Sequence, residues 1–210
     1  MYCGNTHCHD DHISGTNAIK HRVPGCRSFI SRASGAEADE LLEHLDEIHF
    51  GNRFVTAIAT PGHTKGCMSF LLDDHKAILT GDAVLVNGIS GCSIDCGGSL
   101  ETLYESFHDN DIIQNLPDDC VIFPGHETYK GDYEKGHTYS TLRHEKDCNR
   151  LFTCPNKETF VCEEETLARV HPPHPKKMNV AVPANMHDGM DPFFVPGMRT
   201  HLKDSWGIYG

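Results

Sequence analysis

The sequence predicts a mixed α/β fold with a polar site at the ends of several strands. Short apolar runs of β type alternate along the chain with short segments of helical spacing. Histidine or aspartate follows four of the β-type runs, each time beside a glycine or a turn. The 210 residues are enough to enclose one sizeable core. We therefore expect one domain over residues 1–190 and a tail over 191–210.

The first part of the chain is expected to alternate strand and helix. Residues 1–6 read as the end of a strand. A short helix is predicted over 17–22, because Ser-Gly-Thr before it offers a helix start and Pro-Gly after it a stop. A strand is predicted over 26–31, and a helical or turn segment over 37–45.

Two hairpins are expected next. Residues 47–50 and 53–60 read as strands joined through Gly-Asn, a pair typical of tight turns. Residues 68–72 and 77–79 read as a second pair around Asp-Asp-His. The remaining expectations are a loop over 88–99, a buried strand over 120–123, helices over 100–107, 112–116, 139–147 and 163–168, and irregular chain from residue 170.

Composition excludes several classes of partner. The formal net charge of −12 argues against nucleic acid or an anionic membrane as the main partner, and no apolar run reaches membrane-spanning length. The ten cysteines lack paired spacing, so we expect reduced thiols in an intracellular protein. The expected compartment is the mitochondrial matrix or the cytoplasm, and no targeting segment is visible. They are Cys3, Cys8, Cys26, Cys67, Cys92, Cys96, Cys120, Cys148, Cys154 and Cys162.

The segment Thr-His-Cys-His-Asp-Asp-His over residues 6–12 is the strongest signal in the chain. If the backbone is extended, His7, His9 and Asp11 project to one side because side chains alternate along a strand. A turn at Asp11 can then bring His12 to the same cavity. Such nitrogen and oxygen donors suit one or two divalent metals, whereas the alternative is a polar loop that happens to be rich in histidine.

Three further strand ends carry matching donors. His63 stands in Pro-Gly-His-Thr, Asp82 in Thr-Gly-Asp and His126 in Pro-Gly-His, each after a β-type run. The ends of several strands meet at one edge of a sheet, where loops are free to be shaped for a ligand. We therefore expect these side chains to converge on the histidine-rich segment.

Together these motifs resemble the metallo-β-lactamase superfamily. The stretches 5–15, 24–36 and 181–186 resemble in particular the persulfide dioxygenases (sulfur dioxygenases), relatives of glyoxalase II, and the resemblance covers about residues 2–190. It implies an α/β fold of the αββα sandwich type, with the metal site at one edge. Members of the family begin with several strands before the His-x-His segment. The chain is thus expected to be a form of this fold truncated at its N-terminus.

The resemblance also implies a reaction and a set of site residues. One Fe(II) per chain would be held by His7, His63 and Asp82, the catalytic residues, and would serve the oxidation of glutathione persulfide by O₂ to sulfite and glutathione in sulfide detoxification. His9, Asp11, His12 and His126 would surround this metal or bind a second one. Tyr129 and Arg150 match positions that contact glutathione. The family's Gly-Cys-Gly-Arg-Thr-Asp segment corresponds here to Gly-Cys-Ser-Ile-Asp over residues 91–95, with Ser93 in place of the arginine.

Two alternatives remain open from the sequence. A hydroxyacylglutathione hydrolase of the glyoxalase II type would use two zinc ions bridged by Asp82. A catalytically silent form would act as a binding partner.

Without the preceding strands, the sheet would expose an apolar face and an unpaired edge. We therefore expect poor stability of the isolated chain unless a partner covers them, with a homodimer as one candidate.

Overall fold

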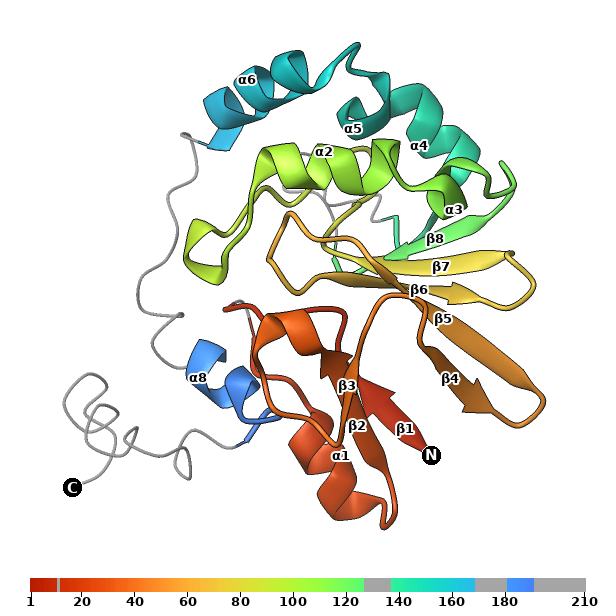
Figure 1. Ribbon diagram of the computed structural model, residues 1–210, viewed down its shortest axis with the longest axis vertical. Helices are drawn as coiled ribbons and strands as arrows, with labels where there is room; N and C mark the ends of the chain where they lie inside the picture. The colour runs from red at the N-terminus through yellow and green to blue at the C-terminus, as the bar shows by residue number, and fades with distance from the viewer. Residues whose placement is uncertain (11, 127–136, 169–180, 191–210) are drawn as a thin grey trace, which may run out of the picture.

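The computed structural model describes residues 1–10, 12–126, 137–168 and 181–190, whose strands form two sheets (Figure 1). The smaller sheet has the order β1-β2-β3 and is parallel throughout. Its strands are β1 (Tyr2–Gly4), β2 (Arg27–Ser31) and β3 (Glu40–Leu42), with helix α1 (Thr16–Arg22) between the first two. β3 contradicts the helical or turn segment predicted over 37–45. Its backbone pairs with β2, a tertiary contact that local sequence does not report.

The larger sheet follows the chain order and contains both predicted hairpins. Neighbouring strands are antiparallel except β7 and β8, which are parallel, so their C-terminal ends lie at the same edge. The strands are β4 (Glu47–Phe50), β5 (Arg53–Ala59), β6 (Met68–Leu72), β7 (Ala77–Gly81), β8 (Val121–Pro124) and β9 (Ser140–Thr141).

Helices cover the outer faces of the two sheets, which gives the expected αββα layering (Figure 1). Those over the larger sheet are α2 (Leu100–His108), α3 (Asp111–Gln114), α4 (Leu142–Cys148), α5 (Arg150–Thr153) and α6 (Lys157–Ala168). Helix α8 (Ala181–Met186) lies beside the smaller sheet, far in sequence from the strands it accompanies. Two short 3-10 helices are η1 (Arg32–Ser34) and η2 (Ile94–Cys96).

Apolar side chains fill each interface between the layers. Ile58, Ile78 and Ile122 of the larger sheet pack with Leu103 and other helical residues. On the opposite face, Met68 and Phe70 cluster with Leu42 of β3, which joins the two sheets. A third cluster brings Cys8 and Ile30 against Met186 of α8. These three clusters hold the layers together by burial of apolar surface.

Several predicted element boundaries differ from the structure. The helix predicted over 139–147 begins only at Leu142, after the short strand β9. The sequence predicts neither α5 nor α8, and α8 falls in the part expected to be irregular. Residues 169–180 and the predicted tail 191–210 lie outside the described residues. Helices of four and six residues carry too little periodicity to be recognised from spacing alone.

Two observations concern the cysteines and the helices of the described residues. All ten cysteines are free thiols. Among the residues whose structure is described, no helix combines the length and apolarity needed to cross a bilayer.

The larger sheet exposes apolar side chains on part of its inner face. Leu79 of β7 pairs with Phe70 on one side and Phe123 of β8 on the other, so all three side chains share that face. Phe70 is buried, but Leu79 and Phe123 are 43% and 42% exposed. β1 stands at the end of the smaller sheet. The apolar face and open edge expected from the sequence are thus both seen in the described part of the chain.

Candidate metal centre

The segment after β1 carries the first two histidines of the site. The carbonyl oxygen of Thr6 accepts a hydrogen bond from the backbone N–H of Met68 at 2.9 Å, which fixes the segment to β6. Cys8 points into the core and is only 7% exposed, whereas His7 and His9 face the opposite way. This alternation is the one predicted for an extended backbone.

His63 lies in the turn between β5 and β6 and is almost fully buried, with 3% exposure. Its Nδ1 lies 2.8 Å from the carbonyl oxygen of Gly91, so Nδ1 donates and Nε2 keeps its lone pair free for a metal. The hydroxyl of Ser90 lies 2.7 Å from the same nitrogen and donates to the Asp82 carbonyl. The preceding Gly62 has a φ of +142°, and a Cβ there would meet Leu103 at 2.3 Å. Only glycine therefore allows this turn.

Asp82 and His126 come from the adjacent ends of β7 and β8. Because these strands are parallel, their C-terminal ends place the two side chains side by side, with His126 Nε2 3.0 Å from Asp82 Oδ2. The backbone N–H of Gly125 donates to the carbonyl of Gly81 at 2.8 Å. A Cβ at Gly125 would lie 2.3 Å from Asp82 Oδ1, so glycine makes room for the carboxylate.

Four side chains converge at this point: His7, His9, His63 and Asp82 each offer one ligand atom, and all these atoms lie within 4.8 Å of one another. His9 Nδ1 is 3.2 Å from His63 Nε2. The Nε2 atoms of His7 and His63 are each 3.6 Å from Asp82 Oδ2. Three imidazole nitrogens and one carboxylate oxygen, at such separations, suit a divalent transition metal.

The protonation states of the site also suit a metal. Burial would raise the pKa of Asp82, but the hydrogen bond from His126 and the charges of His7 and His63 lower it to about 2. Burial lowers the pKa of His63, and this effect outweighs the opposite effect of Asp82. Asp82 is therefore ionised and His63 neutral at neutral pH, the forms in which both bind metals. The residues present thus fit a divalent ion.

His126 contacts the cluster through Asp82, whereas the remaining predicted site residues are not among the four clustered residues or lie outside the described residues. Asp11 and Tyr129 belong to the latter group. His12 is exposed and is not one of the four clustered residues. The guanidinium of Arg150 forms ion pairs with Glu163 and Glu164 of α6. The roles assigned to these residues remain predictions.

Sequence reasoning did not assign a role to Asn185, Ser90 or Gly91. Asn185 contributes its side-chain amide to the backbone of the histidine-rich segment. The residue stands in the stretch 181–186 used for the family resemblance, which is the one signal that pointed to it. The contacts of Ser90 and Gly91 to His63 depend on the folding of the loop after β7, and spacing carries no sign of them.

The chain is similar to several known proteins. The family description "Metallo-beta-lactamase superfamily" matches residues 22–126. The human mitochondrial persulfide dioxygenase ETHE1 is 41% identical over 192 residues, which are 90% of this chain and 70% of that protein. A Bradyrhizobium hydroxyacylglutathione hydrolase is 32% identical over 58% of this chain and 46% of its own. The crystal structure of ETHE1 from Myxococcus xanthus superposes with a TM-score of 0.75 at 33% identity, covering 90% of this chain and 77% of that one.

Proposed function

The chain belongs to the metallo-beta-lactamase superfamily, and on that premise we propose that it is a persulfide dioxygenase. This oxidoreductase would convert glutathione persulfide, O₂ and water into glutathione and sulfite. The single observation that carries the proposal is the 41% identity with human persulfide dioxygenase across 90% of the chain. The cluster of three histidines and one aspartate supports it, because such a reaction requires a metal.

We assign the metal as one Fe(II) per chain, held by His7, His63 and Asp82. Two imidazoles and one carboxylate on one face are typical of non-haem iron oxygenases and leave positions open for substrate and O₂. When bound, the iron would supply the redox chemistry that lets O₂ react with a persulfide sulfur. His63 is oriented by the carbonyl of Gly91, and Asp82 is kept ionised by His126. His9, which shares the cluster, would place a third imidazole nitrogen near the metal.

Arg150 and Tyr129 are the proposed contacts of the glutathione part. A guanidinium can bind a carboxylate of glutathione through paired hydrogen bonds. Arg150 already pairs with two glutamates, so it can exchange one of these carboxylates for that of the substrate.

A second candidate is a hydroxyacylglutathione hydrolase with two metals. One observation favours it. His126 lies 3.0 Å from Asp82 Oδ2 beside the four clustered residues, so Asp82 could bridge one ion held by the histidine-rich segment and a second held by His126. The Bradyrhizobium hydrolase matches 58% of the chain, a shorter match than the dioxygenase gives.

We further propose that the protein acts in the mitochondrial matrix, because its human relative is named as mitochondrial. The substrates are a small thiol derivative and O₂, and a homodimer would cover the exposed side chains of Leu79 and Phe123. Sedimentation velocity on the purified chain measures this oligomeric state.

Metal analysis combined with two assays tests the proposed function. The purified chain is loaded anaerobically with Fe(II) and supplied with glutathione persulfide in an oxygen electrode. One iron per chain and O₂ uptake matched by sulfite formation are expected. Two zinc ions with turnover of S-D-lactoylglutathione in the absence of O₂ would instead support the hydrolase. The Asp82→Ala variant is the control for uncatalysed persulfide oxidation.

A further inference from the structure

We propose that Asn185 of α8 is a positioning residue for the metal centre. Its side chain holds the backbone of residues 9–14, the segment that follows directly from the clustered histidines. This inference rests on the metal site of the proposed function and is independent of the substrate.

A single carboxamide binds three backbone groups of this segment. Nδ2 of Asn185 donates to the carbonyl oxygen of His9 at 2.9 Å and to that of His12 at 2.8 Å. Oδ1 of Asn185 accepts from the backbone N–H of Ser14 at 2.7 Å. The segment from residue 5 to 15 contains neither helix nor strand among its described residues, so its backbone groups need partners from elsewhere. Asn185 supplies donors and an acceptor together.

The contact reaches the metal centre through His9. The carbonyl held by Asn185 belongs to the residue whose ring Nδ1 lies 3.2 Å from His63 Nε2. A shift of this backbone would move the His9 ring away from the cluster and would carry neighbouring His7 with it. Second-layer contacts of this kind orient metal ligands and influence metal affinity.

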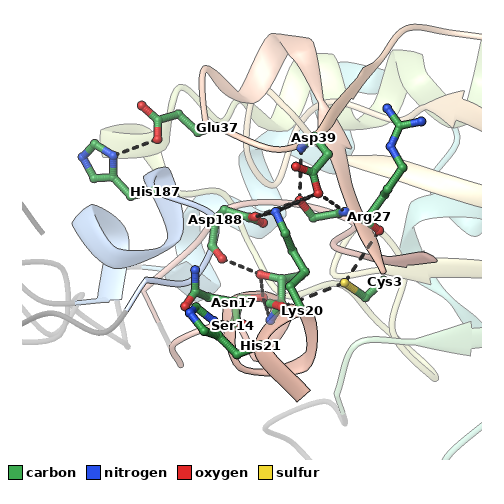
Figure 2. Close-up of polar contacts among 12 residues, drawn as sticks. Cys3, Ser14, Asn17, Lys20, His21, Arg27, Glu37, Asp39, His187 and Asp188 are labelled. Carbon is green, nitrogen blue, oxygen red and sulfur yellow. Dashed lines mark hydrogen bonds and ion pairs between the residues drawn. The ribbon is translucent and has the colours of Figure 1, made fainter. Parts of the chain in front are cut away.

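The helix that carries Asn185 is itself fixed to the smaller sheet. Ala184 is fully buried, and the carbonyl of Met186 accepts from the backbone N–H of Glu37 at 2.8 Å. Just beyond the helix, the carboxylate of Asp188 binds Nζ of Lys20 and the hydroxyl of Ser28, each at 2.8 Å. Figure 2 shows the side chains of Lys20 and Asp188 pointing toward each other. Asn185 is therefore held on a fixed support and can define the shape of the segment.

Hydrogen bonds also hold the C-terminal end of this segment, at Ser14 and Thr16. The hydroxyl of Ser14 donates to Oδ1 of Asn5 at 2.7 Å, and the hydroxyl of Thr16 donates to the carbonyl of Asp188 at 2.7 Å. A Cβ at Gly189 would lie 2.4 Å from the Ser14 carbonyl oxygen, so this part of the chain packs closely on the segment. Residues near both ends of the described chain thus build one metal-binding segment.

The experiment measures Co(II) affinity of the metal-free full chain by competition with a chromophoric chelator, together with the visible spectrum of the bound Co(II). Asn185→Asp keeps the shape of the side chain but removes both donors, and Asn185→Leu removes all three hydrogen bonds. Both variants should bind Co(II) about 10- to 100-fold more weakly than the unchanged chain and should show an altered spectrum.

The matched control is Asn110→Ala, which removes the helix cap of α3. Oδ1 of Asn110 accepts from the backbone N–H groups of Ile112 and Ile113 at 3.1 and 3.3 Å, away from the histidine-rich segment. This variant should melt at a lower temperature yet bind Co(II) within about twofold of the unchanged chain, since loss of a cap acts on helix stability.

The outcomes separate the inference from the proposed function. Unchanged Co(II) affinity in both Asn185 variants overturns the inference, and so does an equal loss in Asn110→Ala. If the unchanged chain binds no Co(II), the metal site and the inference fail together. If it binds Co(II) but consumes no O₂ with glutathione persulfide, the proposed reaction fails. Weaker Co(II) binding by Asn185→Asp still supports the inference in that case.

Discussion

At the scale of single residues, the site depends on groups whose neighbours fix their charge and orientation. His63 has its Nδ1 hydrogen committed to a backbone carbonyl, which leaves Nε2 aimed at the cluster. Asp82 is ionised although it is only 2% exposed, because histidines surround it. Neither property belongs to histidine or aspartate alone, since both arise from burial and specific partners.

The lowered pKa of Asp82 predicts a pH dependence of the metal-free protein. Its folded pKa of about 2 lies below the ordinary value of 3.8, so the ionised group stabilises the fold above pH 3.8, and this stabilisation is lost as the pH falls toward 2. Relative to Asp82→Asn, the unchanged chain should lose roughly 2 kcal/mol of unfolding free energy over this interval. Urea unfolding at several pH values between 2 and 6 measures it, and parallel curves for the two proteins would contradict the prediction.

Arg150 offers a prediction about substrate binding. If its guanidinium binds a carboxylate of glutathione, Arg150→Ala should raise KM for glutathione persulfide about tenfold or more and change kcat little, since one charge-assisted contact is worth roughly 1.5–3 kcal/mol. Steady-state O₂ uptake measures both constants. The control is Arg143→Ala, because Arg143 pairs with Asp118 on an exposed surface. An unchanged KM in Arg150→Ala removes this residue from the substrate site.

At the scale of elements, a partly buried polar junction joins α1, β2 and the chain just after α8. Nζ of Lys20 lies 2.7 Å from Asp39 Oδ2, 2.8 Å from Asp188 Oδ2 and 3.3 Å from the hydroxyl of Ser28, which is fully buried (Figure 2). A network of this kind contributes more to the free energy of unfolding than an isolated surface pair does, because several partners share one charge. It connects the chain after α8, and with it the helix that holds the histidine-rich segment, to the smaller sheet.

Removing the central lysine should therefore loosen this junction. Lys20→Met is expected to lower the free energy of unfolding by about 1–2 kcal/mol at neutral pH, measured by urea denaturation. Arg32→Met should have almost no effect, because Arg32 and its partner Glu43 are 59% and 68% exposed. Equal losses in the two variants would argue against a special role for the junction.

The same junction has a defined pH window. Burial would lower the pKa of Lys20, but its bonds to Asp188 and Asp39 raise this pKa overall. The contribution of Lys20 to the free energy of unfolding is therefore present below about pH 10.5 and is lost as the pH rises through the raised pKa. The bond with Lys20 lowers the pKa of Asp39, whose contribution is present above pH 3.8 and is lost toward lower pH. The difference between Lys20→Met and the unchanged chain should thus be largest between these limits.

At the scale of the whole molecule, the described residues form two sheets of unequal width that leave apolar side chains exposed. The side chains of Leu79 and Phe123 lie on the inner face of the larger sheet beyond the width of the smaller one. Among the described residues, β1 stands at the end of the smaller sheet and has a strand on one side only. Such surfaces favour association with another chain.

We therefore expect the purified chain to self-associate, and substitution of this face to reduce the association. Leu79→Lys combined with Phe123→Lys should lower the sedimentation coefficient and the light scattering at equal concentration, without a lower melting temperature. Phe50→Lys is the control, because Phe50 is an exposed apolar residue of β4, at the opposite edge of the sheet. A monomeric unchanged chain with a cooperative melt at high temperature would refute this expectation and that of poor stability.

The sequence by itself determined which way the first histidines of the site face and most of the framework. The period of two predicted that His7 and His9 face away from buried Cys8, and the turn residues located both hairpins. These features depend on near neighbours in the chain, which the sequence records directly.

Only the tertiary structure decided which distant groups meet. The inclusion of His9 among the four clustered residues, the pairing of β3 with β2, and the three hydrogen bonds of Asn185 all join segments whose relative position is set by packing. Local spacing has no information on such contacts, because they depend on how the layers close over the shared core.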